Sequence, residues 1–150
     1  MTLERGNSGL SPAVASTTFL WPWGWAVGGG AVAAAANALM NLSPNVLMML
    51  PGALSTGVFF FALIGGGVMF LSGKGDRRAR RYAGKHPWQT AMVPAGIGAV
   101  GVAAFSYIGL ALSGSLFLGL FAAAAAGIGA GIALWVILGL IASVAGNKSA

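Results

Sequence analysis

The sequence predicts an all-α integral membrane protein, a bundle of four transmembrane helices built from two helical hairpins joined by a basic loop. Two long segments, 6–73 and 86–147, contain no charged residue. A charge at the centre of a bilayer is costly, so uncharged segments of this length favour a membrane environment. Hydrophobic residues make up 57% of the 150 residues and charged residues only 7%, which agrees with this class. We treat residues 1–150 as a single membrane domain.

Each uncharged segment is long enough for two spans, because one span uses about 20 residues. Turn-forming residues divide the first segment at Asn41–Asn45 and the second at Ser113–Ser115. The basic loop is expected at 73–89, and the expected spans are 17–40, 46–72, 90–112 and 116–145.

The first expected span is the weakest of the four, because Gly and Ala make up most of residues 24–38. Such a segment needs partner helices around it if it spans. If it does not span, three spans remain. A third interpretation is a cleaved signal-like segment, with Ala34-Ala35-Ala36 as its small-residue cleavage site.

The basic residues predict the orientation of the chain. Six of the eight lie in the loop between the two uncharged segments, namely Lys74, Arg77, Arg78, Arg80, Arg81 and Lys85. Basic loops stay in the cytoplasm, so with four spans both termini are cytoplasmic. The same side chains attract anionic phospholipid headgroups of the bilayer. A nucleic-acid partner is not expected, since the basic residues form one loop between apolar spans.

Four tryptophans are expected at the same boundary of the membrane. Trp21, Trp23 and Trp25 begin the first span, and Trp88 begins the third. An indole at this depth can bury its ring and hydrate its N–H.

Small residues recur every four positions in three of the spans and predict close helix packing. A four-residue repeat lies along one face of a helix, and small side chains there let a neighbouring backbone approach. These faces hold either the helices of one chain or neighbouring subunits together, as a homo- or hetero-oligomer. The predicted packing residues are Ala26, Gly30, Ala34 and Ala38; Ala91, Ala95, Ala99 and Ala103; and Gly119, Ala123, Gly127 and Gly131, with Ala122, Ala126 and Ala130 beside them.

The sequence predicts no catalytic, metal-binding or cofactor-binding residue. There is no cysteine, and His86 is the one histidine. Glu4 and Asp76 are the two carboxylates and are separated by an entire hairpin. A metal site normally needs three or four ligands, and acid–base catalysis needs paired groups. We therefore expect a protein that is not an enzyme.

The segment from Gly65-Gly66-Gly67 through Lys74-Gly75-Asp76-Arg77-Arg78 joins two Gly-rich helices by a short basic loop. Over about residues 57–105 this arrangement resembles the pilin subunits of conjugative type IV secretion systems. The fourth span has no counterpart in those two-helix proteins. The resemblance implies a structural subunit of a secretion or conjugation assembly, held in the bacterial inner membrane.

The sequence thus favours a non-enzymatic structural or assembly subunit of a larger membrane complex. The rival function is a small pore, a holin-like channel or an uncoupled permease. A pore needs a wettable stripe, so its polar side chains would have to converge on one axis; the candidates are Asn37, Asn41, Asn45, Ser55, Thr56 and Ser106.

Overall fold

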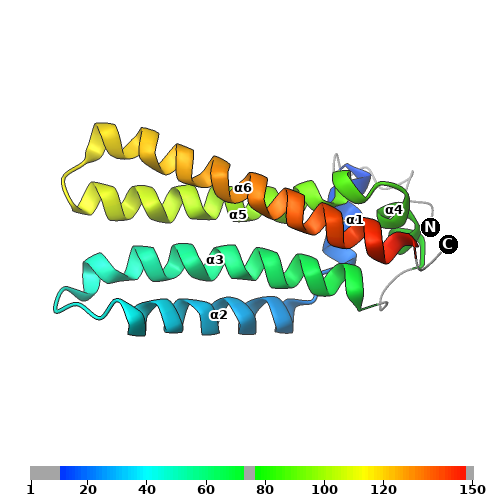
Figure 1. Cartoon of the computed structure of the whole chain (residues 1–150), viewed down its shortest axis with the longest axis horizontal. Helices are drawn as coiled ribbons and strands as arrows, with labels where there is room; N and C mark the ends of the chain where they lie inside the picture. Colours follow the sequence, from blue (N-terminus) through cyan, green and yellow to red (C-terminus); the bar gives the residue numbers. More distant parts are fainter. Residues whose placement is uncertain (1–10, 73–76, 148–150) are drawn as a thin grey trace.

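The computed structural model describes residues 11–72 and 77–147, and these residues form helices and connecting turns without a β-strand. Lys74 and Asp76 of the expected basic loop lie outside the described residues. The helices, labelled in Figure 1, are α1 (Pro12–Leu20), α2 (Trp23–Met40), α3 (Val46–Leu71), α4 (Arg77–Lys85), α5 (Pro87–Leu112) and α6 (Leu116–Asn147).

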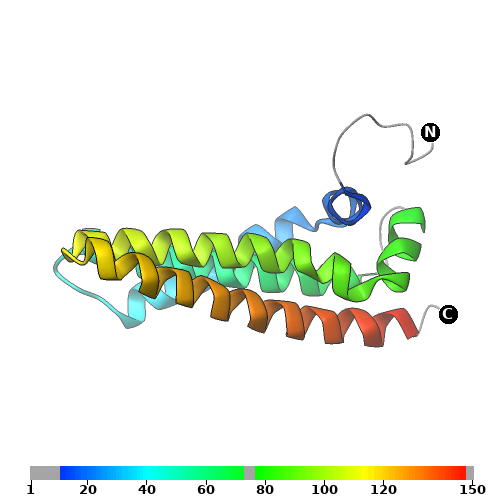
Figure 2. The ribbon, with the colours of Figure 1, turned by 90° about the horizontal axis from the view of Figure 1, so that it is seen from above.

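The four long helices run alongside one another as two hairpins, α2–α3 and α5–α6, whose turns lie at the same end of the bundle (Figure 1). The short helices α1 and α4 lie at the opposite end. Figure 2 shows α1, in dark blue, end-on, so it lies across the axis of the bundle. Helices α3, α5 and α6 are long and apolar enough to cross a membrane. The chain is therefore a helical integral membrane protein with three candidate spans.

Helix α2, which lies in the first of the four expected spans, is not among the helices that are long and apolar enough to cross a membrane, so three of the four expected spans are found. It has 18 residues, which at about 1.5 Å per residue gives a length of about 27 Å. The hydrocarbon core of a bilayer is about 30 Å thick. Helix α2 nevertheless lies beside α3 along much of its length (Figure 1).

The structure differs from the expected elements in two places. The first expected span, 17–40, is interrupted, because α1 ends at Leu20 and α2 begins only at Trp23. Trp21 between them is extended, with φ −65° and ψ 119°, as favoured for a residue that precedes proline. The expected basic loop, 73–89, contains the helix α4. Ala79 and Ala83 of α4 are buried while its arginines are exposed, so α4 is amphipathic.

Local sequence explains the ends of the long helices. The side chain of Asn45 accepts a hydrogen bond from the backbone N–H of Met48 and caps α3. Pro87 occupies the first position of α5, where a missing N–H is harmless. Gly114 has φ +87°, a conformation that side-chain-bearing residues rarely adopt, and it closes the tight turn before α6.

The core lies where α6 meets α3 and α5. Leu134 and Leu138 of α6 are fully buried. Leu134 fills the space beside Gly98 of α5, and a side chain at Gly66 of α3 would meet Leu138 at 2.7 Å. Glycines thus provide the space that these leucines occupy, so the three candidate spans interlock within one chain.

Candidate functional site

The predicted packing residues Ala26, Gly30 and Ala34 of α2 face α3. Ala26 and Gly30 are buried, and a side chain at Gly30 would meet the carbonyl oxygen of Gly57 at 2.8 Å. Ala34 packs on the same glycine, since a side chain at Gly57 would meet the Cβ of Ala34 at 2.9 Å. The α2 ridge therefore packs within the chain, and Gly57 is a partner that the four-residue repeats did not include.

Gly127 and Gly131 of α6 face Ala99 and Ala103 of α5. A side chain at Gly127 would meet the Cβ of Ala103 at 2.6 Å and the carbonyl oxygen of Ala99 at 2.7 Å. A side chain at Gly131 would meet the Cβ of Ala99 at 2.8 Å. Ala99, Ala103 and Gly131 are half-buried, and the predicted packing residues of these two helices that are buried are Ala91, Ala95, Gly119, Ala123 and Gly127.

The neighbouring ridge on α6 faces outward. Ala122 and Ala126 are exposed, and Ala130 is half-buried. Large apolar side chains share this outer surface, among them Phe121, Ile128 and Ile132, which are 62%, 63% and 57% exposed. Such a surface suits contact with acyl chains.

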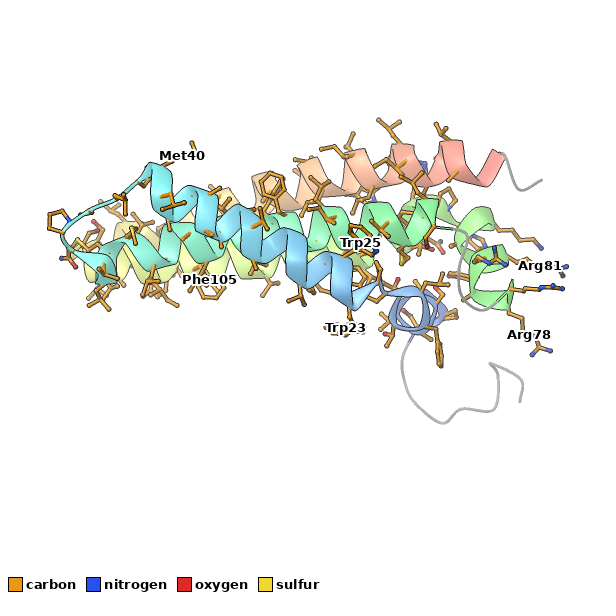
Figure 3. All side chains as sticks on the ribbon, turned by 90° about the horizontal axis from the view of Figure 1, so that it is seen from below. Trp23, Trp25, Met40, Arg78, Arg81 and Phe105 are labelled. Carbon is orange, nitrogen blue, oxygen red and sulfur yellow. The ribbon has the colours of Figure 1, made fainter. Side chains whose placement is uncertain are left out.

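The basic residues of α4 lie at one end of the bundle. Arg77, Arg78, Arg80, Arg81 and Lys85 are exposed. Figure 3 shows the side chains of Arg78 and Arg81 projecting away from the bundle. Ala79 and Ala83 hold the opposite side of α4 against the protein, where α4 contacts α1, α5 and α6. The structure therefore presents the described cations on one helical surface.

The tryptophans at this end have different surroundings. Trp23 and Trp25 are 63% and 70% exposed. Trp88 packs edge-on against Trp135, whose indole N–H donates to the carbonyl oxygen of Trp88 at 3.0 Å. The contact between Trp88 and Trp135 was not predicted from the sequence. The two residues are 47 positions apart and meet only because α5 and α6 form a hairpin.

The expectation that the indole N–H of Trp21 is hydrated is wrong. Trp21 is only 9% exposed, and its Nε1 is buried without a hydrogen-bond partner in the described part of the chain. The extended backbone before Pro22 directs the ring onto α3. There it covers Gly65 and lies 5.4 Å from the ring of Phe61.

Replacing Trp21 separates the contribution of its ring from that of its N–H. A buried donor without a partner costs about 1–3 kcal/mol. We therefore expect Trp21→Phe to leave thermal stability in detergent unchanged or raised. Trp21→Ala should lower the free energy of unfolding by about 3–5 kcal/mol, because the ring contacts are lost. Equal losses in the two variants would contradict this expectation, because they would show that the indole atoms over Gly65, which Phe lacks, stabilise the fold more than the unpaired N–H destabilises it.

Three of the six polar candidates for a pore, Asn41, Asn45 and Thr56, form hydrogen bonds with nearby backbone groups. Asn45 caps α3, and the amide of Asn41 donates to the carbonyl oxygen of Asn37. The hydroxyl of Thr56 donates to the carbonyl oxygen of Gly52 within its own helix. Asn41 and Asn45 are exposed at the α2–α3 turn, whereas Ser55 and Ser106 lie half-buried on α3 and α5. Nothing in this placement favours a pore.

His86 lies at the junction of α4 and α5. It is exposed, and its ring centroid is 4.9 Å from that of Tyr82. Among the described residues, no three His, Cys, Asp or Glu side chains form a group able to hold a metal ion.

A groove of about 550 Å³ opens between α1, α4 and α5. Val14 of α1 and Met92, Val93 and Ile97 of α5 give it apolar walls. At the α4 end, the Tyr82 hydroxyl donates to Gln89 Oε1 at 3.2 Å. The groove could not be predicted from the sequence, because its walls come from three separate elements.

No protein-family model, curated protein or solved structure matches this chain. Its function is therefore inferred from its own surfaces. These are the exposed face of α2, the basic surface of α4 and the groove beside it.

Proposed function

We propose that this chain is a non-enzymatic structural subunit of a larger membrane assembly. The observation that carries the proposal is the exposed face of α2. This helix packs on α3, and its other side presents Trp25, Val32 and Leu39, each about 70% exposed. Gly28 and Ala35 lie on the same exposed side.

This face suits another helix better than it suits lipid. Small residues leave a flat surface that a neighbouring backbone can approach closely, and close packing is a main source of helix association in membranes. Helix α2 is also not among the helices that are apolar enough to span. Within the chain, α3 covers one side of α2. A second subunit would cover the other side. The outer surface of α6, with its larger apolar side chains, remains for lipid.

In this assembly α2 is the fourth span. It begins after α1 and lies beside α3 up to the turn that the two helices share (Figure 1). The basic end then faces the cytoplasm by the positive-inside rule, and both termini share that side. The resemblance to conjugative pilins favours the bacterial inner membrane, and a pilin-like assembly is one concrete form of the proposal.

Filling the exposed face of α2 tests the proposal. A side chain at Gly28 would meet no atom within 4 Å, so Gly28→Leu should leave the fold of the subunit intact. We expect it to convert the assembly to smaller species in mild detergent, measured by size-exclusion chromatography with light scattering. Gly129→Leu is the matched control, because Gly129 is exposed on α6 and also has open space beside it. Identical sizes for both variants and the wild type would overturn the proposal.

A further inference from the structure

The exposed side of α5 contains a depression at the end of the groove away from α4. Gly96 and Ile97 line this end of the groove, and a side chain at Gly96 would meet no atom within 4 Å. Met92 and Val100, four residues to either side of Gly96, are 60% and 70% exposed. Ala104 continues the same side of the helix and is also exposed. Large and small residues therefore alternate along this surface, which we call the α5 face.

Contacts with α3 give the height of Trp25, meaning its position along the long axis of the bundle. The ring of Trp23, two residues before it on α2, lies 6.3 Å from the ring of Phe61. A side chain at Gly30, five residues after it, would meet the Cβ of Phe61 at 3.0 Å. Trp25 lies between these two residues of α2, so it is at the height of Phe61 on α3.

Helix α3 relates this height to the α5 face. Ala62 follows Phe61, and a side chain at Gly98 of α5 would meet the Cβ of Ala62 at 3.2 Å. Gly98 is two residues beyond Gly96, which is about 3 Å along the helix. Helices α2 and α5 both begin at the end of the bundle that holds α1 and α4 (Figure 1). Since helical side chains lean toward the N-terminus, the ring of Trp25 leans to the height of Gly96.

We propose that the exposed face of α2 packs on the α5 face of a second copy of this chain, with the ring of Trp25 over Gly96. Subunits that share one orientation in the membrane present the same residues at the same height. A protruding indole of one subunit therefore meets the depression of the next. The inference rests on the proposed function, and it names the surface that the partner presents to α2.

The rest of the two surfaces is complementary in size. Both helices rise by about 1.5 Å per residue, so the heights also pair the residues that follow. The small Gly28 comes to the height of the large Val100, and Val32 comes to the height of the small Ala104. A large residue thus meets a small one at successive positions, which permits close packing of the two helices.

The contact joins two different surfaces of the subunit. Helix α3 contacts both α2 and α5 and lies between them (Figure 1), so each subunit can use both surfaces at once. Such a heterologous contact repeats from one subunit to the next. The exposed side chains of each surface present an area on the order of 500 Å², so the contact buries about 1,000 Å² in total, which a specific interface needs.

Cysteine cross-linking of the full chain in nanodiscs tests the pairing, because the chain contains no cysteine of its own. The variant Gly28→Cys with Val100→Cys should form disulfides between subunits on mild oxidation. A disulfide requires Cα atoms about 4.4–6.8 Å apart. Each subunit carries both halves of the contact, so we expect a ladder of dimers, trimers and larger species on a denaturing gel. Either substitution alone should give the monomer band.

Gly28→Cys with Gly129→Cys is the matched control. Gly129 is exposed on α6. It lies at the height of Ala99, because the glycines two residues to either side of it both pack against Ala99. Gly129 therefore matches Val100 in height and in exposure but belongs to a different surface, and this control should give no ladder.

A pair of substitutions tests the contact between the indole and the depression. Trp25→Ala removes the ring, and Gly96→Leu fills the depression without meeting an atom of its own subunit within 4 Å of the added Cβ. Each change should raise the concentration at which the oligomer dissociates in mild detergent by about tenfold or more. The two together should cost little more than either one, because both remove the same contact. Fully additive losses would overturn the pairing.

The gels also separate this inference from the proposed function. A dimer from Gly28→Cys alone would show that α2 packs on α2 of the second copy, which overturns the pairing and supports the assembly. A ladder from the Gly129 control, or no ladder from an oligomer of the Gly28 and Val100 variant, would likewise overturn the pairing alone. A monomeric wild-type protein in light scattering would overturn the proposed function itself.

Discussion

Gly127→Leu is expected to separate α5 from α6 and to destabilise the subunit. The backbone carbonyl of Ala99 and the Cβ of Ala103 lie 2.7 and 2.6 Å from the position of an added Cβ. Neither atom belongs to a flexible side chain, so the helices themselves must move. Overpacking of this kind typically costs about 1–3 kcal/mol, and we expect a value at or above the upper limit. Thermal unfolding in detergent measures the loss.

Gly129→Leu provides the control on the same helix. A side chain at Gly129 meets no atom within 4 Å, so its effect should remain within about 0.5 kcal/mol. If Gly127→Leu unfolds at the temperature of the wild type and leaves the oligomer unchanged, the close approach of α5 and α6 does not hold the subunit together.

Replacing the four arginines of α4 by glutamine is expected to scramble the orientation of the protein. The change leaves Lys74 and Lys85 opposed by Asp76 between the two uncharged segments, so little positive charge remains to hold this end on the cytoplasmic side that we propose for it. Because the chain contains no cysteine, Ser113→Cys in the α5–α6 turn gives a single reporter. An impermeant maleimide should label it from the outside in the parent protein and only partly in the variant.

Replacing the same arginines by lysine keeps the charge and should preserve the orientation. Full external labelling in the glutamine variant would show that the α4 arginines do not set the topology. The helical bundle itself should form in either variant, because these side chains are exposed.

The long helices could be predicted because membrane spans follow from apolar length and from turn residues. Helix α3, Val46–Leu71, lies within one residue of the expected segment 46–72 at each end. Helix α5 begins at Pro87, a few residues before the expected 90, and α6 extends to Asn147. Helix ends depend on capping and local contacts, which hydropathy does not report.

The basic end could be predicted only in part. The charge pattern located the cations but suggested a loop, although Ala79 and Ala83, four residues apart, were the available signal for an amphipathic helix. The position of Trp21 depends on Gly65, far along the chain in α3. The groove likewise requires α1, α4 and α5 to meet. Such features follow from tertiary packing, which no local pattern specifies.

The packing faces of the helices could likewise be predicted only in part. The four-residue repeats identified small residues that the structure places at α2–α3 and α5–α6 contacts, such as Gly30 and Gly127. They could not distinguish packing within the chain from packing between subunits. The two kinds of packing can be told apart only when the exposed faces of the helices are known. The outer side of α2, around Gly28, is exposed, so it is the surface available for packing between subunits.

The mass of the wild-type protein, released from nanodiscs with bound lipids retained, decides whether the chain forms the proposed assembly. We predict a defined or extended oligomer, because a neighbouring subunit would cover the exposed side of α2. A monomer at every protein concentration would contradict it, because it would show that α2 needs no cover beyond α3 and the surrounding lipid.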